Sequence, residues 1–323
     1  MKKLLLALSL VSGGLLPGLA AARPLAFVIN SAEASVSMID MDTKEEVKRI
    51  PVLREPHHMA LTPDGKSLLI GDTAGNAVFF LDPVTGDVQR RATISDPYQL
   101  QYSPDSKWMV VAGLARNQID IYDAATLTLA HRIPASSMPS HINFSPDSSV
   151  TYVSLQGTDA LMAIDVHTGA VLWNTKIGKS PAGVLWLDGK ILVGIMGADY
   201  VAVVNPANGA VERKIVTAKG AHNLFISPDS HTLYVCNRVD GSISVLDPKT
   251  LAVRGRIAMS GGPDDMDFAP DGKIWVTRRW AHTVALLDPA TGQFTTIETG
   301  RSPHGIWLNT HPNQPAPTRV SAK

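Results

Sequence analysis

The chain has 323 residues, of which 45% are hydrophobic and 18% are charged, so it can bury a substantial core in a single folded unit. Basic and acidic residues are equal at 29 each, and the formal net charge is zero. This balance argues against a broad nucleic-acid-binding surface, because such a surface needs a clear basic excess, but it leaves room for a small basic patch.

The first 22 residues have the composition of a secretory signal peptide. Lys2 and Lys3 give a positive start, residues 4–16 are mostly apolar, and the small residues 20–22 offer a cleavage site before Arg23. This apolar run is too short to span a bilayer, and no later run is long enough. We therefore expect an exported protein without a membrane span, located in the periplasm if the source is a Gram-negative bacterium.

Three short apolar segments follow at residues 25–30, 35–40 and 46–52, and each is predicted to be a β-strand. After them a sequence pattern recurs at intervals of 40 to 42 residues. It consists of one turn, one strand, a Ser-Pro-Asp-like turn and a second strand. Its copies begin at Pro56, Pro97, Pro139, Pro181, Ala221, Pro263 and Pro303.

Each copy has the same internal plan. In the first copy, strands are expected at residues 58–61, 67–71, 76–81 and 87–94, with tight turns at 62–66 and 82–86. Proline presets φ in these turns and glycine supplies the positive φ. Four short strands per repeat of about 42 residues are typical of a β-propeller blade, and no window has the period of a helix.

The two ends of the chain complete the ring. The segments at 25–30, 35–40 and 46–52 lack the first strand of their blade, and residues 303–308 form a first strand with nothing after it. The sequence therefore predicts an all-β, seven-bladed β-propeller over residues 23–309, with four-stranded blades and one blade closed by both termini. Residues 310–323 are predicted to be a disordered, Pro-rich tail.

The chain contains a single cysteine, Cys236, and no Cys-x-x-Cys-His sequence. An internal disulfide and a covalent c-type haem are therefore excluded. Cys236 lies in an apolar alternation, so we expect it to be a small buried side chain.

The second and third strands of several repeats resemble the YVTN repeat. The resemblance is carried by residues 233–237 followed by 241–247, and by the segments 26–40, 151–165 and 274–288. The chain thus resembles the YncE-like, YVTN-repeat seven-bladed β-propellers, whose repeat is related to those of haem d1-type and lactonase-type propellers. The resemblance implies a periplasmic propeller, and it implies no particular reaction because these relatives perform different tasks on one scaffold.

The residues that follow the seven repeat starts should surround one mouth of the central channel, because equivalent positions in propeller blades face a common axis. Three of them are histidines with a basic residue three positions earlier, in the pairs Arg54 and His57, Lys219 and His222, and Arg301 and His304. The other residues at or beside these positions are His58, Tyr98, Ser140, His141, Ala182, Asp264 and Asp265.

The turns between second and third strands should lie at the same mouth and make it basic. They include Arg116, Asp159, Asp199, Arg238, Arg278, Arg279, Trp280 and His282. Arg279 and Trp280 place a guanidinium group beside an aromatic ring, a combination that suits carboxylates and planar ligands. The alternative is a solvated turn in which Trp280 packs against a neighbouring residue.

Two interpretations of the repeated histidines stay open. They could be copies inherited by blade duplication, or they could converge on a ligand, since imidazoles hold metals and axial haem positions. In the second case the expected metal ligands are His57, His58, His222 and His304. The expected contacts of a cofactor are Arg54, His57, Lys219, His222, Arg279, Trp280, Arg301 and His304.

Three functions follow from these residues. The first is a periplasmic binding propeller, non-catalytic or serving assembly, that holds a small anionic cofactor, a haem-like tetrapyrrole or a transition metal at the channel mouth. The second is a lactonase-like hydrolase with His57 or His304 as base and Arg279 as charge stabiliser. The third is a scaffold for a periplasmic protein partner. We expect a monomer and no enzymatic activity in the first case.

Overall fold

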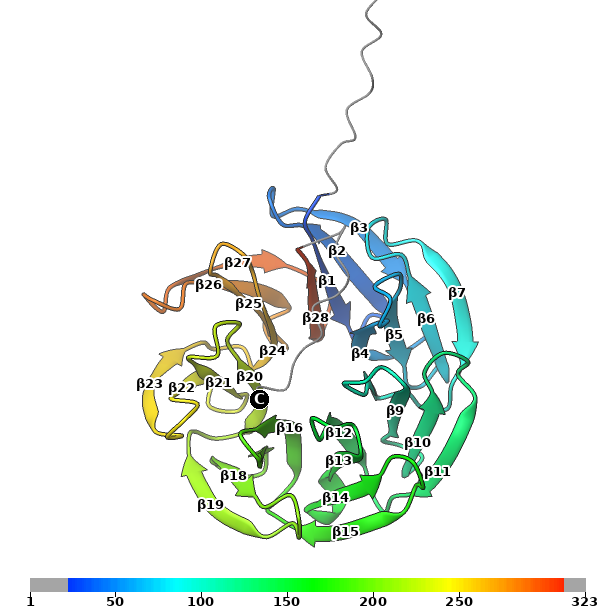
Figure 1. Ribbon diagram of the computed structural model, residues 1–323. Coiled ribbons are helices and arrows are strands. Elements are labelled where there is room, and N and C mark those ends of the chain that lie inside the picture. The colour runs from blue at the N-terminus through cyan, green and yellow to red at the C-terminus, as the bar shows by residue number, and fades with distance from the viewer. Residues whose placement is uncertain (1–22, 311–323) are drawn as a thin grey trace, which may run out of the picture.

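The computed structural model describes residues 23–310. The predicted signal peptide at 1–22 and the tail from 311 onward lie outside the described residues. Residues 23–310 form 28 strands in seven four-stranded sheets, arranged as blades around a central axis (Figure 1). The predicted seven-bladed all-β propeller is confirmed, and the one helical element of this region is a short 3₁₀ turn, Gln156–Thr158.

Each blade runs from an innermost strand at the channel to an outermost strand at the rim. The innermost strands are β4 (Pro56–Leu61), β8 (Gln99–Tyr102), β12 (Pro139–Phe144), β16 (Pro181–Leu187), β20 (Ala221–Ile226), β24 (Pro263–Phe268) and β28 (Pro303–Asn309). The second strands are β1 (Leu25–Asn30), β5 (Leu68–Asp72), β9 (Trp108–Gly113), β13 (Val150–Leu155), β17 (Lys190–Ile195), β21 (Leu233–Asn237) and β25 (Ile274–Arg278).

The outer half of each blade is equally regular. The third strands are β2 (Ser35–Asp40), β6 (Ala77–Leu81), β10 (Gln118–Asp123), β14 (Ala160–Asp165), β18 (Tyr200–Val204), β22 (Ser242–Leu246) and β26 (Thr283–Leu287). The outermost strands are β3 (Glu46–Pro51), β7 (Val88–Thr93), β11 (Leu129–Pro134), β15 (Val171–Lys176), β19 (Val211–Val216), β23 (Val253–Ala258) and β27 (Phe294–Glu298).

The ring is closed in the blade that combines β28 with β1, β2 and β3, as predicted. The C-terminal strand β28 pairs antiparallel with β1, so that Leu25 lies opposite Asn309 and Phe27 opposite Trp307. We call this blade 1 and number the others 2 to 7 from β4 onward. Closure of this kind leaves no open sheet edge between the first and last blades.

The turns that end the third strands explain why the repeat is so regular. In blade 2, Asp82 Oδ1 accepts hydrogen bonds from the backbone N–H groups of Val84 and Thr85, and Gly86 adopts a φ of 67°. Such Asx turns fix the hairpin geometry locally, and glycine reaches this φ without steric cost. The same two bonds recur at Asp165 and Asp247.

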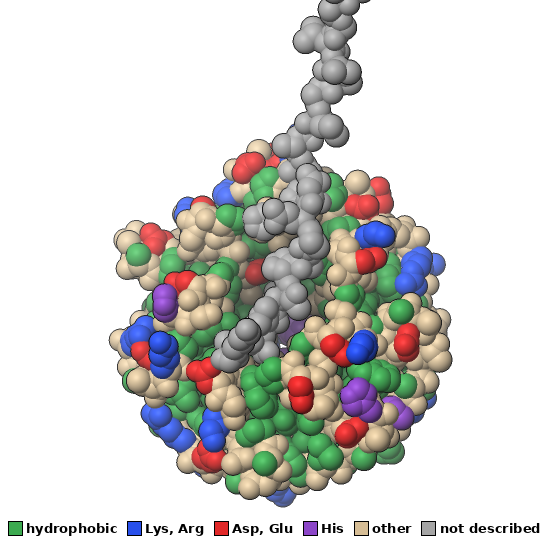
Figure 2. Space-filling model, viewed as in Figure 1, with side chains coloured by type: hydrophobic (Ala, Val, Ile, Leu, Met, Phe, Trp, Pro, Cys, Tyr) green, Lys and Arg blue, Asp and Glu red, His purple; other side chains and the backbone are tan. Residues whose placement is uncertain are grey.

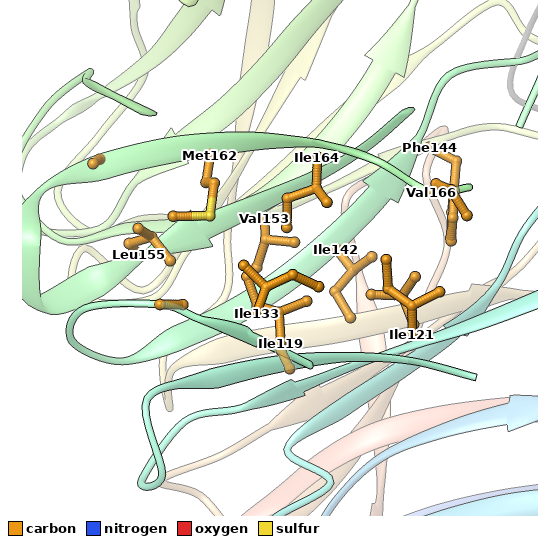
Figure 3. Close-up of a cluster of buried hydrophobic side chains, with 14 residues drawn as sticks. Ile119, Ile121, Ile133, Ile142, Phe144, Val153, Leu155, Met162, Ile164 and Val166 are labelled. Atoms are coloured by element: carbon orange, nitrogen blue, oxygen red, sulfur yellow. The ribbon is translucent and has the colours of Figure 1, made fainter. Parts of the chain in front are cut away.

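The hydrophobic core is divided among the interfaces between neighbouring blades. Each of the seven buried clusters in the described region joins two adjacent blades. The cluster in Figure 3 joins Ile119, Ile121 and Ile133 of blade 3 to Ile142 and Phe144 of blade 4. Cys236 is fully buried in the interface of blades 6 and 7, which confirms the expectation of a small buried side chain.

Small residues near the ends of second strands let neighbouring blades approach at the channel. A Cβ atom on Gly194 of β17 would lie 2.2 Å from the carbonyl oxygen of His222 in the next blade. A Cβ atom on Gly71 of β5 would similarly lie 2.4 Å from the carbonyl oxygen of Pro97. These contacts are with backbone, so they fix the positions of the first residues of the innermost strands.

Replacing Gly194 with alanine should therefore destabilise the protein by about 1–3 kcal/mol, because the added methyl group displaces β20. Gly255→Ala is the matched control, since Gly255 also lies in a strand but a Cβ atom there would meet no atom within 4 Å. Thermal unfolding followed by circular dichroism measures both. Equal midpoints for the two variants would contradict the predicted contact.

Candidate functional site

Five histidines converge in the channel at the mouth where the innermost strands begin. His57 and His58 come from β4, His141 from β12, His222 from β20 and His304 from β28. Each is at most 5% exposed. The ring centroids lie 4.2 Å apart for His57 and His304, 4.6 Å for His58 and His304, 5.3 Å for His58 and His141, and 5.1 Å for His141 and His222. The predicted convergence of imidazoles on the channel is therefore seen in the structure.

A bulge in the innermost strand explains how two consecutive histidines reach one cluster. In blade 2 the register shifts between Pro56, which pairs with Asp72, and Met59, which pairs with Ile70. The extra residue breaks the usual alternation of side chains between the two faces of a strand. His57 and His58 can then both contact His304.

Blade 5 contributes no functional side chain to the cluster, and its small residues make room for blade 6. At the equivalent position it has Ala182 followed by Gly183. A Cβ atom on Gly183 would lie 2.6 Å from the carbonyl oxygen of His222. The six other blades supply the polar groups.

Three of the histidines lie close enough together to be candidate ligands of one metal ion. One ring nitrogen from each of His57, His58 and His304 can be chosen so that all three atoms lie within 4.8 Å of one another. His57 Nδ1, His58 Nε2 and both ring nitrogens of His304 are buried without a hydrogen-bond partner. Buried polar atoms are normally paired, so the unpartnered nitrogens of these three neighbouring rings need an explanation.

The fully buried carboxylate of Asp264 is the electrostatic centre of the other side of the cluster. It accepts hydrogen bonds from Arg238 and, at 3.3 Å, from Arg279 Nη1. Its Oδ2 lies 3.5 Å from His304 Nε2, without a hydrogen bond. The side chains of Arg238 and Arg279 are 14% and 21% exposed, so this is a nearly buried network of one anion and two cations.

His222 belongs to that network and not to the three-histidine group. Its Nδ1 lies 3.0 Å from Asp264 Oδ1, and its Nε2 lies 2.7 Å from Arg238 Nη2. These partners assign the neutral tautomer in which Nδ1–H donates to the carboxylate and Nε2 accepts from the guanidinium. The ring nitrogens of His222 are therefore occupied, although the sequence proposed this residue as a metal ligand.

All five imidazoles are held in the neutral form. Burial lowers the pKa of His58 to about 3 and that of His222 to about 4, and it lowers the pKa values of His57, His141 and His304 well below the usual range. Burial alone would raise the pKa of Asp264, but the charge of Arg238 and the hydrogen bond from His222 hold it well below its ordinary value. At neutral pH the site thus has uncharged imidazoles beside an ionised carboxylate, and the lone pair of His222 is already engaged by Arg238.

Tyr98 completes the wall of the cluster. Its ring centroid lies 4.1 Å from that of His57, and burial raises its pKa to about 12. Tyr98, His141 and Asp264 were placed at the mouth by the sequence but were not assigned to a ligand. Arg238 was similarly one of several basic residues in the mouth turns, and no sequence signal singled it out as the partner of Asp264.

The remaining predicted cofactor contacts lie at the surface of the same mouth. Arg54, Lys219 and Arg301 are exposed, and Trp280 is 55% exposed. Arg279 connects the buried cluster with the surface of the mouth, because it contacts Asp264 and also lines a surface depression. The depression is lined by Ser31, Ala32, Arg54, Glu55, Ala74, Arg279 and Ser302.

The family model of the YNCE-like beta-propeller matches residues 6–314. The chain belongs to this family. The resemblance of its YVTN-like segments is thereby confirmed, and a search of curated proteins finds no match. Members share the propeller scaffold, which positions the channel cluster but does not by itself assign a reaction.

Several solved structures share the fold of this YNCE-like propeller. A functionally unknown protein from Desulfotomaculum acetoxidans DSM 771 is 13% identical, with a TM-score of 0.76 over 88% of this chain and 98% of that one. The dihydro-heme d1 dehydrogenase NirN in complex with DHE is 17% identical, with a TM-score of 0.66 over 88% and 74%. A putative 6-phosphogluconolactonase from Bacteroides uniformis ATCC 8492 is 15% identical, with a TM-score of 0.67 over 88% and 99%.

At these identities the likeness is one of fold.

In residues 23–310 no helix is long and apolar enough to cross a bilayer. On the face shown in Figure 2, basic and acidic side chains of the described residues are interspersed around the rim and form no broad patch of one sign, as the zero net charge predicts.

Proposed function

We propose that this YNCE-like propeller is a periplasmic binding protein that holds one transition-metal ion in its channel, with His57, His58 and His304 as ligands. The observation that carries the proposal is the convergence of three buried imidazoles: one ring nitrogen of each lies within 4.8 Å of the others, and each ring has a buried nitrogen without a hydrogen-bond partner. Imidazole nitrogen suits zinc, copper, nickel and iron. The composition of residues 1–22 supports export, and hence metal uptake outside the cytoplasm.

The energetics favour an ion at this point. A buried polar atom without a partner costs about 1–3 kcal/mol, and this group contains several. Zinc–nitrogen bonds of about 2.0–2.1 Å in tetrahedral geometry place ligand atoms roughly 3.4 Å apart, so modest rotation of the three rings would bring them into range. Because the imidazoles are neutral, binding need not displace protons from them at neutral pH.

A haem-like tetrapyrrole has less support, although a haem d1 enzyme shares the fold. The imidazole rings contact one another at centroid separations of 4.2 to 5.3 Å, which leaves no slot between them for a planar macrocycle. Arg54, Lys219 and Arg301, which would pair its carboxylates, are exposed rather than turned into the cluster. The likeness to a putative 6-phosphogluconolactonase concerns the fold and carries no reaction to this chain.

The proposal predicts one bound ion per chain and its loss in a ligand variant. Protein purified from the periplasm is analysed by mass spectrometry for metals, treated with chelator, and titrated calorimetrically with Zn²⁺, Cu²⁺, Ni²⁺ and Co²⁺. His58→Ala should weaken binding by more than about 100-fold, because loss of an outer-sphere partner alone typically costs 10–100-fold.

His231→Ala is the matched control. His231 is a surface histidine whose side chain is 79% exposed and lies beside Asp229 in a turn between β20 and β21. This variant should bind the ion as the unmodified protein does. A chain that takes up no ion after chelator treatment, or a His58→Ala variant with unchanged affinity, would overturn the proposal.

A further inference from the structure

The cluster carries more positive charge than a metal-binding site needs. Within the hydrogen-bonded network around Asp264, that carboxylate contributes one negative charge and Arg238 and Arg279 contribute two positive charges, while the imidazoles are neutral. The formal charge of these groups is thus +1, and a divalent ion would raise it to +3. An excess of this size inside a channel is costly unless an anion compensates it.

The guanidiniums are placed to hold such an anion. Asp264 Oδ1 accepts a hydrogen bond from Arg238 Nη2, and Oδ2 accepts one from Arg279 Nη1. The carboxylate is therefore bonded to one terminal nitrogen of each arginine. Arg238 Nε is buried without a partner. Arg238 Nη2 also donates to His222 Nε2, and Arg238 Nη1 lies 3.7 Å from Met196 Sδ, so Nε is the donor of Arg238 that remains for a further anion. Guanidinium N–H groups are strong donors to carboxylates and other oxyanions.

A route from solvent reaches the same arginine. Arg279 lines the depression between blades 1, 2 and 7, whose other polar side chains are Ser31, Arg54, Glu55 and Ser302. Glu55 is the acidic residue at this opening, and Arg54 beside it offsets its charge. Arg279 therefore lies between the surface depression and the imidazoles of the channel.

From this arrangement we infer that the metal centre takes a small oxyanion as an additional ligand, which enters through this depression and is held by Arg279 and Arg238. The inference rests on the proposed metal site and specifies what the ion binds next. A compact anion such as formate should fit the buried position, and a bulky carboxylate such as benzoate should not.

The test uses the Co²⁺-loaded full chain, whose visible spectrum responds to the ligands of the ion. Formate titrated at constant ionic strength should shift the spectrum saturably, and benzoate should leave it unchanged. Arg279→Met should weaken formate binding at least 10-fold. Its affinity for Co²⁺ should be retained or increased, because a positive charge beside the ion is removed, whereas mere disruption of the fold would lower both affinities.

Arg278→Met is the matched control. The guanidinium of Arg278 donates to the carbonyl oxygen of Ser260 and to Thr283 Oγ1, away from Asp264, and formate binding should be unaffected. If Co²⁺ binds and formate leaves the spectrum unchanged, or if Arg279→Met binds formate as tightly as the unmodified protein, the anion site is wrong and the metal site stands. If Co²⁺ itself does not bind, both the metal site and the anion site fail.

Discussion

Replacing Asp264 with asparagine should destabilise the metal-free protein by about 3 kcal/mol at neutral pH. The substitution leaves Arg238 and Arg279 without their carboxylate and deprives His222 Nδ1–H of its charged acceptor. Removing one partner from a buried ionic network typically costs about 3–5 kcal/mol, and the lower value applies because both guanidiniums keep some contact with solvent. Urea unfolding at pH 7 measures the change in midpoint.

Asp271→Asn provides the comparison for this variant. Asp271 is an exposed residue of the turn between β24 and β25, where its carboxylate accepts one backbone hydrogen bond from Lys273. Its replacement should shift the midpoint only slightly, since exposed positions away from special features usually change stability by about 0.5 kcal/mol or less. Equal stability of the Asp264 variant and the unmodified protein would show that the two arginines do not depend on this carboxylate.

Acid should begin to destabilise the metal-free protein at about pH 6.5, above the range in which carboxylates titrate. The pKa is about 3 for folded His58 and about 4 for His222, whereas an unfolded histidine titrates at about 6.5. Below pH 6.5 the unfolded chain therefore binds protons that the folded chain does not, and the free energy of unfolding falls as pH falls. Each histidine contributes about 1.4 kcal/mol per pH unit, so these two alone remove roughly 5 kcal/mol between pH 6.5 and 4.5.

Unfolding by urea at a series of pH values gives this slope directly. His58→Gln should reduce the slope by about 1.4 kcal/mol per pH unit across the same window, because one proton-binding difference is removed. His231→Ala removes a solvent-exposed imidazole and should leave the slope unchanged. A free energy of unfolding that stays constant from pH 6.5 to 4.5 would mean that the five imidazoles are not buried in the metal-free protein.

The fold was predictable because the turn residues of each repeat determine the local backbone conformation. Turns such as the one at residues 82–86 are fixed by an aspartate that binds two backbone amides and by a glycine at positive φ, and these signals lie within a few residues of each other. Their recurrence at 40 to 42 residues then fixes the number of blades. The closing blade followed from an incomplete set of strands at each terminus, which β28 and β1 confirm.

For the site, the sequence could predict only which residues occupy equivalent positions in the blades and therefore face the channel. Equivalent positions face a common axis, so His57 and His304, in neighbouring blades, could be expected to meet. Two features depend on geometry that single residues do not reveal. The bulge between Pro56 and Met59 lets His58 join the cluster, and the reach of Arg238 across to Asp264 ties His222 into an ionic network.

The seam where the ring closes has a consequence for how the site comes into existence. His304 lies on β28, the last strand of the described residues, and its proposed co-ligands His57 and His58 lie on β4 of blade 2. β28 has to dock between β1 and β4 before the three imidazoles share one space. If β28 were undocked, the site would lack His304, so an ion held here would link β28 to β4 and stabilise the closed propeller.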